Sequence, residues 1–156
     1  RLAKFVGEYN IKYTGIEPSE IAVCEAKTNG INVIHGTADQ LPFNNDTFEV
    51  VIFGHCLYLC DREDLFKIAY EADRVLIKGG WIIIYDFFSN YSYSNKYCHK
   101  EGVNSYKMDY RKLFTWHPYY TCMSHKVRRQ LILDYTDDSD EWIAVSVLKN
   151  SSESLL

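Results

Sequence analysis

Three titratable side chains follow short apolar runs, at points where a strand would give way to a loop. Glu17 ends the run "YTGIE", Asp39 lies shortly after the next such run, and His55 directly follows "FEVVIFG". In open parallel α/β sheets, ligands lie beyond the carboxyl ends of the strands, where a carboxylate accepts hydrogen bonds from the hydroxyls of a ribose. A second carboxylate there could accept from an exocyclic amine. The spacing is therefore typical of a nucleotide site, although a helix dipole alone also favours an acid beside a helix N-terminus.

The elements that would position these residues alternate between strands and helices. Strand, helix and strand at short spacing predict a parallel sheet covered by helices on both faces. The run at 48–54 is almost wholly apolar, as in a strand buried on both faces. The expected strands are residues 12–17, 31–36, 48–54 and 81–87, and the expected helices are residues 1–9, 19–30 and 61–80.

The pattern changes after residue 87. Residues 88–118 are polar, aromatic and irregular, and two longer strands are expected at 119–129 and 141–150. Because a short connection joins these strands, they should pair antiparallel. The sequence thus predicts an α/β protein of Rossmann-like, doubly wound type, with a mostly parallel sheet and an antiparallel C-terminal hairpin. We expect a single domain over residues 1–149, with a polar tail at 150–156 that frays.

Composition excludes several classes of protein. A chain of 156 residues with 47% hydrophobic and 24% charged residues is typical of one soluble globular domain. The formal net charge of -4 argues against a mainly electrostatic binder of nucleic acid or membrane surfaces. The apolar runs are far shorter than the roughly 20 residues that span a bilayer. The five cysteines include no C-x-x-C pair, which favours neither a zinc site nor a disulfide framework, so we expect a cytoplasmic setting.

Three longer features together carry a resemblance to a known family. They are Glu17 at the end of its strand, "ADQLPF" followed by "FEVVIF", and the helix-to-strand passage "RVLIKGGWIII". In combination they resemble the class I S-adenosylmethionine-dependent methyltransferases. The likeness is closest to the small-molecule enzymes related to ubiquinone and menaquinone biosynthesis. It covers about residues 1–88, and the final two strands by topology. It implies S-adenosylmethionine as cofactor and a small-molecule acceptor.

The resemblance implies how the adenosine would be held. Glu17 would bind the ribose hydroxyls, and Pro18 and Ser19 would flank the adenosine. Ala38 and Asp39 would meet the adenine edge, with Asp39 accepting from its amine.

The methyl side would lie just past the strand at 48–54. Gly54 and His55 would lie near the methionine part of the cofactor and the transferred methyl. Methyl transfer from a sulfonium mainly requires alignment, and a base helps when the nucleophile carries a proton. His55 is the first candidate for this base and Tyr58 the second, with a packing role as the alternative for His55. Asp86 could face the substrate or cap a loop, and the acids form no convincing metal site.

In the family that the chain resembles, the segment corresponding to 88–118 often covers the substrate. Its aromatic residues could stack on a flat or apolar acceptor, form a cation cage, or pack the segment onto the sheet. After the strand at 48–54 the chain reads "HCLYL" in place of the "NPPY"-like turn of DNA amine methyltransferases. We therefore expect a small-molecule partner, and neither nucleic acid nor membrane.

The glycine-rich loop of the family is absent from the chain. In nucleotide-binding folds of this kind the loop precedes the acid by roughly 20 residues, which places it before Arg1. We expect strand one and this loop to precede Arg1, so that the domain at 1–149 is incomplete at its N-terminus. The strands at 12–17 and 48–54 would then have open edges, which allows a homodimer by strand exchange.

Two other functions fit the same residues. Were Arg1 the true start, a catalytically inactive nucleotide-binding or partner module would be expected. An NAD-dependent oxidoreductase would also use Glu17 on a ribose, although "ADQLPF" and the antiparallel finish favour the methyltransferase.

Overall fold

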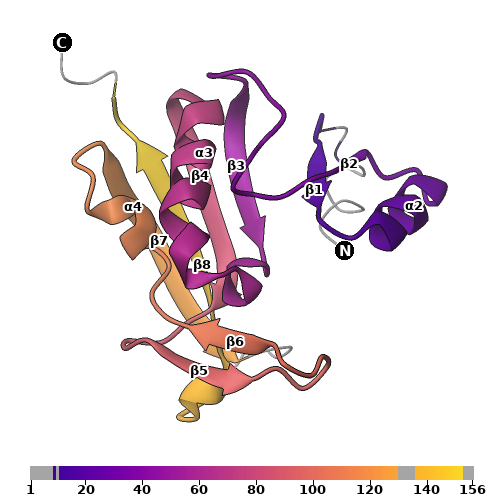
Figure 1. Cartoon of the computed structure of the whole chain (residues 1–156). Coiled ribbons are helices and arrows are strands. Elements are labelled where there is room, and N and C mark those ends of the chain that lie inside the picture. Colours follow the sequence, from indigo (N-terminus) through magenta and orange to yellow (C-terminus); the bar gives the residue numbers. More distant parts are fainter. Residues whose placement is uncertain (1–8, 10, 130–135, 153–156) are drawn as a thin grey trace.

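The computed structural model describes Tyr9, residues 11–129 and residues 136–152. Within these residues the strands form a two-stranded sheet β1-β2, a four-stranded sheet β3-β4-β8-β7 and a two-stranded sheet β5-β6 (Figure 1). The helix expected over residues 1–9 lies outside the described residues except for Tyr9, which is in a turn. None of the described helices is long and apolar enough to cross a bilayer.

The first unit is a strand, a helix and a parallel strand, as the sequence predicts. The side chain of Ser19 caps the helix by accepting from the N–H of Ala22 at 3.3 Å. The helix ends before Gly30, whose φ of 71° is a conformation that glycine adopts without strain. The three elements are β1 (Gly15–Glu17), α2 (Glu20–Thr28) and β2 (Val33–His35).

The main sheet joins a parallel pair to an antiparallel hairpin. β3 and β4 are parallel, whereas β8 pairs antiparallel with both β4 and β7. β7 is therefore an edge strand, and it carries the basic run "HKVRR". The four strands are β3 (Phe48–Gly54), β4 (Leu76–Phe87), β7 (Tyr120–Arg129) and β8 (Trp142–Asn150), and a 3-10 turn η3 (Ser139–Glu141) precedes β8.

The helix expected over 61–80 is shorter in the structure. Two 3-10 turns, η1 (Leu57–Leu59) and η2 (Arg62–Asp64), precede α3 (Leu65–Val75). β4 begins at once, because Leu76 pairs with Phe48, and the ladder resumes at Trp81 after an irregularity.

Two glycines explain this irregular turn. Gly79 has a φ of 73°, and a Cβ on Gly80 would lie 2.7 Å from Leu76 Cδ1. Both positions therefore require glycine.

Residues 88–118 are more ordered than the sequence predicts. They contain β5 (Tyr93–Lys96), β6 (Asn104–Lys107) and α4 (Lys112–Thr115). The β5-β6 hairpin lies beyond the carboxyl end of β3 (Figure 1). Arg62 links the hairpin to the turn after β3. Its guanidinium lies 4.1 Å from the ring centre of Tyr106 on β6 and donates to the carbonyl of Leu57 at 2.7 Å.

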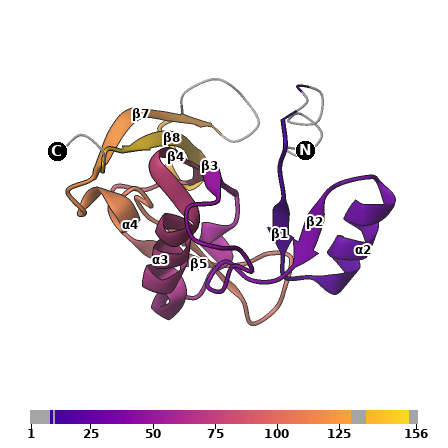
Figure 2. The ribbon, with the colours of Figure 1, turned by 90° about the horizontal axis from the view of Figure 1, so that it is seen from above.

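The prediction that β3 is buried on both faces is wrong. Val50 and Ile52 are 42% and 38% exposed, because they lie on the face of β3 opposite to Val51 and Phe53, which pack against the core. Among the described residues β3 pairs only with β4 and β1 only with β2, and Figure 2 shows the β1-α2-β2 unit standing apart from the four-stranded sheet. The core lies instead between α3, α4 and the main sheet, where Ile82 and Leu148 are fully buried.

Two isoleucines on neighbouring strands allow a matched test of this core. Ile82→Ala should lower the free energy of unfolding by about 3–5 kcal/mol, because it opens a cavity in the packed layer under α3. In the chain of residues 1–156, Ile52→Ala removes the same atoms from an exposed position on β3 and should cost about 1 kcal/mol or less. Urea unfolding of both variants measures the difference. Equal losses would show that the edge of β3 is as tightly packed as the core.

Candidate active site

Glu17 lies where β1 gives way to α2, as the sequence predicts. Its Oε1 accepts a hydrogen bond from the N–H of Ser19 at 2.9 Å, at the N-terminus of the helix. The ring of His35, on the paired strand, lies with Nε2 3.0 Å from the carbonyl oxygen of Pro18. These contacts hold the carboxylate at the strand end, half-buried and open to a ligand.

Asp39 follows the adjacent parallel strand, β2. Its Oδ2 lies 2.9 Å from Nζ of Lys67 on α3. Hydrogen bonding from Thr37 and then from Lys67 holds the pKa of Asp39 below its ordinary value, so the group is a carboxylate at neutral pH. Ala38 packs against the main core and anchors the start of this loop.

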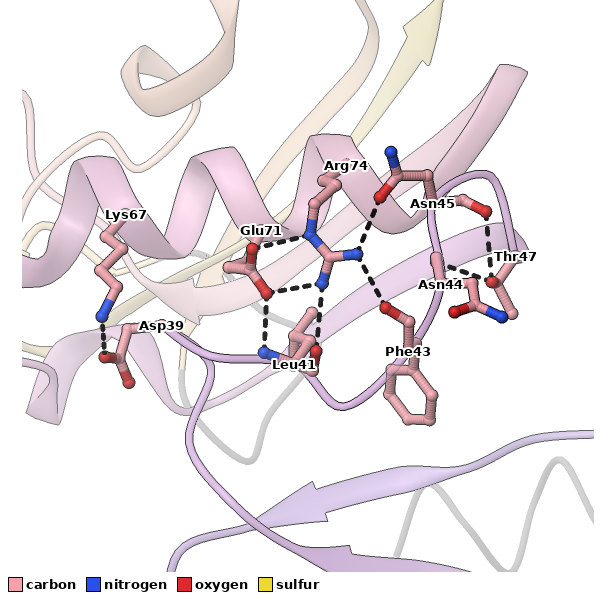
Figure 3. A network of polar contacts seen from close by, with 9 residues as sticks. All are labelled: Asp39, Leu41, Phe43, Asn44, Asn45, Thr47, Lys67, Glu71 and Arg74. Carbon is pink, nitrogen blue, oxygen red and sulfur yellow. Dashed lines mark hydrogen bonds and ion pairs between the residues drawn. The ribbon is translucent and has the colours of Figure 1, made fainter.

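Polar side chains of α3 hold the rest of this loop in a network of hydrogen bonds (Figure 3). The sequence did not predict this network. Glu71 accepts from the N–H of Leu41 at 2.7 Å, and Arg74 donates to the carbonyls of Leu41 and Phe43 at 3.0 and 2.7 Å. Glu71 and Arg74 also pair with each other at 2.7 Å. The available signal was an acid and a base three residues apart in "EADR", with the acid on the apolar face of a helix.

Gly54 ends β3, and His55 follows it directly. His55 has a φ of 63°, which is uncommon for a residue other than glycine, and its N–H donates to the carbonyl of Tyr85 at 2.7 Å. Burial lowers the pKa of the imidazole, which is therefore neutral at pH 7. Among the described residues its Nδ1 is buried without a hydrogen-bond partner.

Aromatic rings surround this histidine. The ring centres of Tyr58, Phe87 and Tyr85 lie 4.7, 4.8 and 5.8 Å from that of His55. Tyr97, from the segment after β5, contacts Tyr58. Burial raises the pKa of Tyr58, so its hydroxyl keeps its proton at neutral pH and can donate but not act as a base.

Asp86 caps the loop that follows His55. The side chain is 1% exposed, and its Oδ2 accepts from the N–H groups of Cys56 and Leu57 at 3.0 and 2.8 Å. Its Oδ1 accepts from the N–H of Phe87 at 2.8 Å. Desolvation raises the pKa of Asp86 to about 6, against the smaller effect of these N–H donors. Asp86 therefore fixes the backbone that directly follows His55.

The expected residues gather in two groups. His55 and Tyr58 meet in the aromatic cluster, whereas Glu17 and Asp39 follow the adjacent strands β1 and β2. No set of three or more His, Cys, Asp or Glu side chains within the described part of the chain could hold a metal ion.

Comparison with known proteins identifies the family. The family described as "Methyltransferase domain" matches residues 1–84. The chain belongs to this family. A demethylmenaquinone methyltransferase of Staphylococcus haemolyticus is 36% identical over 87 residues, which are 53% of this chain and 35% of that protein. The chain spans only 35–38% of the length of the curated relatives that it matches.

Solved methyltransferase structures share the fold. An S-adenosylmethionine-dependent methyltransferase from Methanosarcina mazei superposes with a TM-score of 0.70 at 15% identity, over 88% of this chain and 81% of that one. The 1,6-didemethyltoxoflavin-N1-methyltransferase of Burkholderia thailandensis, with 1,6-didemethyltoxoflavin and S-adenosylhomocysteine bound, also gives 0.70, at 12% identity, over 95% and 65% of the two chains. The predicted class I methyltransferase fold is thus confirmed.

Asp86 should give this methyltransferase-family chain a distinctive dependence of stability on pH. The unfolded carboxyl loses its proton near 3.8, whereas the folded one keeps it to about pH 6. The folded state thus binds more protons in this window, so the contribution of Asp86 to stability falls as pH rises through it, by about 3 kcal/mol in all.

Asp86→Asn removes this titration. Urea unfolding from pH 4 to pH 7 should show the stability of the wild type falling relative to the variant by about 2.5 kcal/mol, since pH 4 already lies just above the unfolded pKa of 3.8. A difference that stays constant across this range would contradict the assigned pKa.

Proposed function

We propose that the protein is an S-adenosylmethionine-dependent methyltransferase that acts on a small-molecule acceptor. The observation that carries this proposal is a pair of acids, Glu17 and Asp39, on the turns that follow two adjacent parallel strands. In this position one carboxylate can take ribose hydroxyls and the other the adenine amine. The names of the relatives, a demethylmenaquinone and a didemethyltoxoflavin methyltransferase, support a small-molecule acceptor.

The remaining cofactor contacts follow from the same placement. Pro18 and Ser19, exposed at the start of α2, would flank the adenosine, and Ala38 would meet the adenine edge. Gly54, with no side chain at the end of β3, leaves room for the methionine part. We propose that strand one and the glycine loop are supplied from outside residues 1–149, between β1 and β3, whose facing edges are unpaired among the described residues.

Methyl transfer requires little from the protein beyond alignment of the acceptor with the methyl group. When bound, the cofactor supplies a methyl group that is already activated. His55 is neutral, and its Nδ1 could accept the proton of an O–H or N–H acceptor as the new bond forms. Asp86 holds the backbone after His55 and so keeps this nitrogen in place. Tyr58 would donate a hydrogen bond to the acceptor or pack against it.

The aromatic cluster suits a flat, neutral acceptor. Tyr58, Phe87 and Tyr97 offer ring faces and edges, and the nearest acid, Asp86, is buried and occupied by backbone donors. Asp86 therefore offers no free counter-charge to a cationic acceptor. The segment at 88–118 would cover this acceptor. Two copies of the chain would form a homodimer by exchanging strands at the open edges of β1 and β3.

Binding of the cofactor product is the direct test of the function. Isothermal titration of the full-length protein should show binding of S-adenosylhomocysteine and none of NAD. The reverse result would replace the methyltransferase with an oxidoreductase, and binding of neither would favour an inactive partner module.

Glu17 has a matched control three residues away. Glu17→Ala should weaken S-adenosylhomocysteine binding about 10- to 100-fold, since hydrogen bonds to a charged group are lost. Glu20→Ala removes an exposed acid from the first turn of the same helix and should change the affinity by less than about 2-fold. Circular dichroism checks that both variants fold. Equal affinities for the two variants would leave Glu17 as a residue that only favours the helix.

A further inference from the structure

One face of α3 is built around the loop that carries Asp39. Lys67, Glu71 and Arg74 are four and three residues apart, so the helix presents them on the same side. All three contact the segment from Asp39 to Asn45, which lies along that face (Figure 3).

Arg74 makes the most contacts to the loop. Its Nη1 donates to the carbonyl of Phe43 at 2.7 Å and to Oδ1 of Asn45 at 3.0 Å, while its Nη2 donates to the carbonyl of Leu41 at 3.0 Å. Its Nε and Nη2 donate to Glu71 at 2.8 and 2.7 Å. Only a planar guanidinium has donors for all of these acceptors, so lysine is not equivalent here.

Glu71 binds the backbone of Leu41, which Arg74 also contacts. Its Oε2 accepts from the N–H of Leu41 at 2.7 Å, so the donor of Leu41 is held by Glu71 and its acceptor by Arg74. The Glu71 and Arg74 side chains are only 11% and 18% exposed, which shields their attraction from solvent. Leu41 is two residues from Asp39, and the far end of the loop is held through Phe43 and Asn45.

We propose that Glu71 and Arg74 form a positioning pair that sets the adenine-recognition geometry of Asp39. The pair acts through the loop backbone, and Lys67 orients the carboxylate directly at 2.9 Å. This inference rests on the proposed function, in which Asp39 accepts from the adenine amine. Loss of the pair should therefore remove selectivity for that amine while the ribose contact at Glu17 remains.

The test compares two ligands in the full-length protein by isothermal titration. One is S-adenosylhomocysteine, and the other is its analogue with hydrogen in place of the 6-amino group. The wild type should prefer the first by about 10-fold or more, as expected for a hydrogen bond to a carboxylate. In Arg74→Lys the affinity for S-adenosylhomocysteine should fall to within about 2-fold of that for the analogue, which itself should change little.

A matched control and a second variant keep the result decisive. Arg111 pairs with Asp109 at 2.8 Å with similar exposure and lies in another part of the chain, so Arg111→Lys should keep the full preference. If Arg74→Lys does not fold, Glu71→Gln, which keeps the shape of the side chain, should show the same loss of preference.

Three outcomes would overturn the inference and are distinguishable. A wild type that binds neither ligand would remove the proposed function itself. A wild type that binds both equally would remove Asp39 as the acceptor of the amine. A variant that weakens both ligands in equal proportion, or that keeps the wild-type preference, would show that the pair only stabilises the fold.

Discussion

The parallel pairing of β3 with β4 is the constraint on which the proposed methyl side of the site depends. It sets Gly54 beside Tyr85, so the chain leaving β3 turns over the end of β4. His55 then donates its N–H to the carbonyl of Tyr85, and Asp86 takes the next two N–H groups. A one-residue slip of β3 along β4 would turn the side chains of β3 to the opposite faces of the sheet and separate these partners. The aromatic cluster, the cap and the hairpin over them all follow from this register.

Two buried carboxylates, Asp86 and Glu71, illustrate how this fold uses charge. Both accept backbone N–H groups, yet burial raises the pKa of Asp86, whereas hydrogen bonding from Arg74 lowers that of Glu71. The difference is the partner, because neutral donors offset desolvation only in part and a guanidinium offsets it fully. The chain thus fixes the loop after His55 through a carboxyl that titrates, and the loop after Asp39 through an ion pair that stays charged.

Local signals predicted much of this structure. Ser19 and Gly30 mark the ends of α2 because capping depends on a few adjacent atoms, and Glu17 was placed by the same local pattern. The end of α3 was misjudged because Leu76 continues the helical spacing, and only its pairing with Phe48 shows that β4 has begun. The Arg74 network was missed because its acceptors lie 29 to 33 residues away, beyond the reach of periodicity. The burial of β3 was overestimated because an apolar run does not reveal whether both faces of its strand are covered.

The central claim is that one ligand spans the turns after β1, β2 and β3. Amide chemical shifts of the isotope-labelled full-length protein, recorded with and without S-adenosylhomocysteine, test it residue by residue. The account predicts shifts at Glu17, Asp39 and Gly54 and none along the edge strand β7. Shifts confined to the β7-β8 hairpin, or none at the three turns, would contradict it.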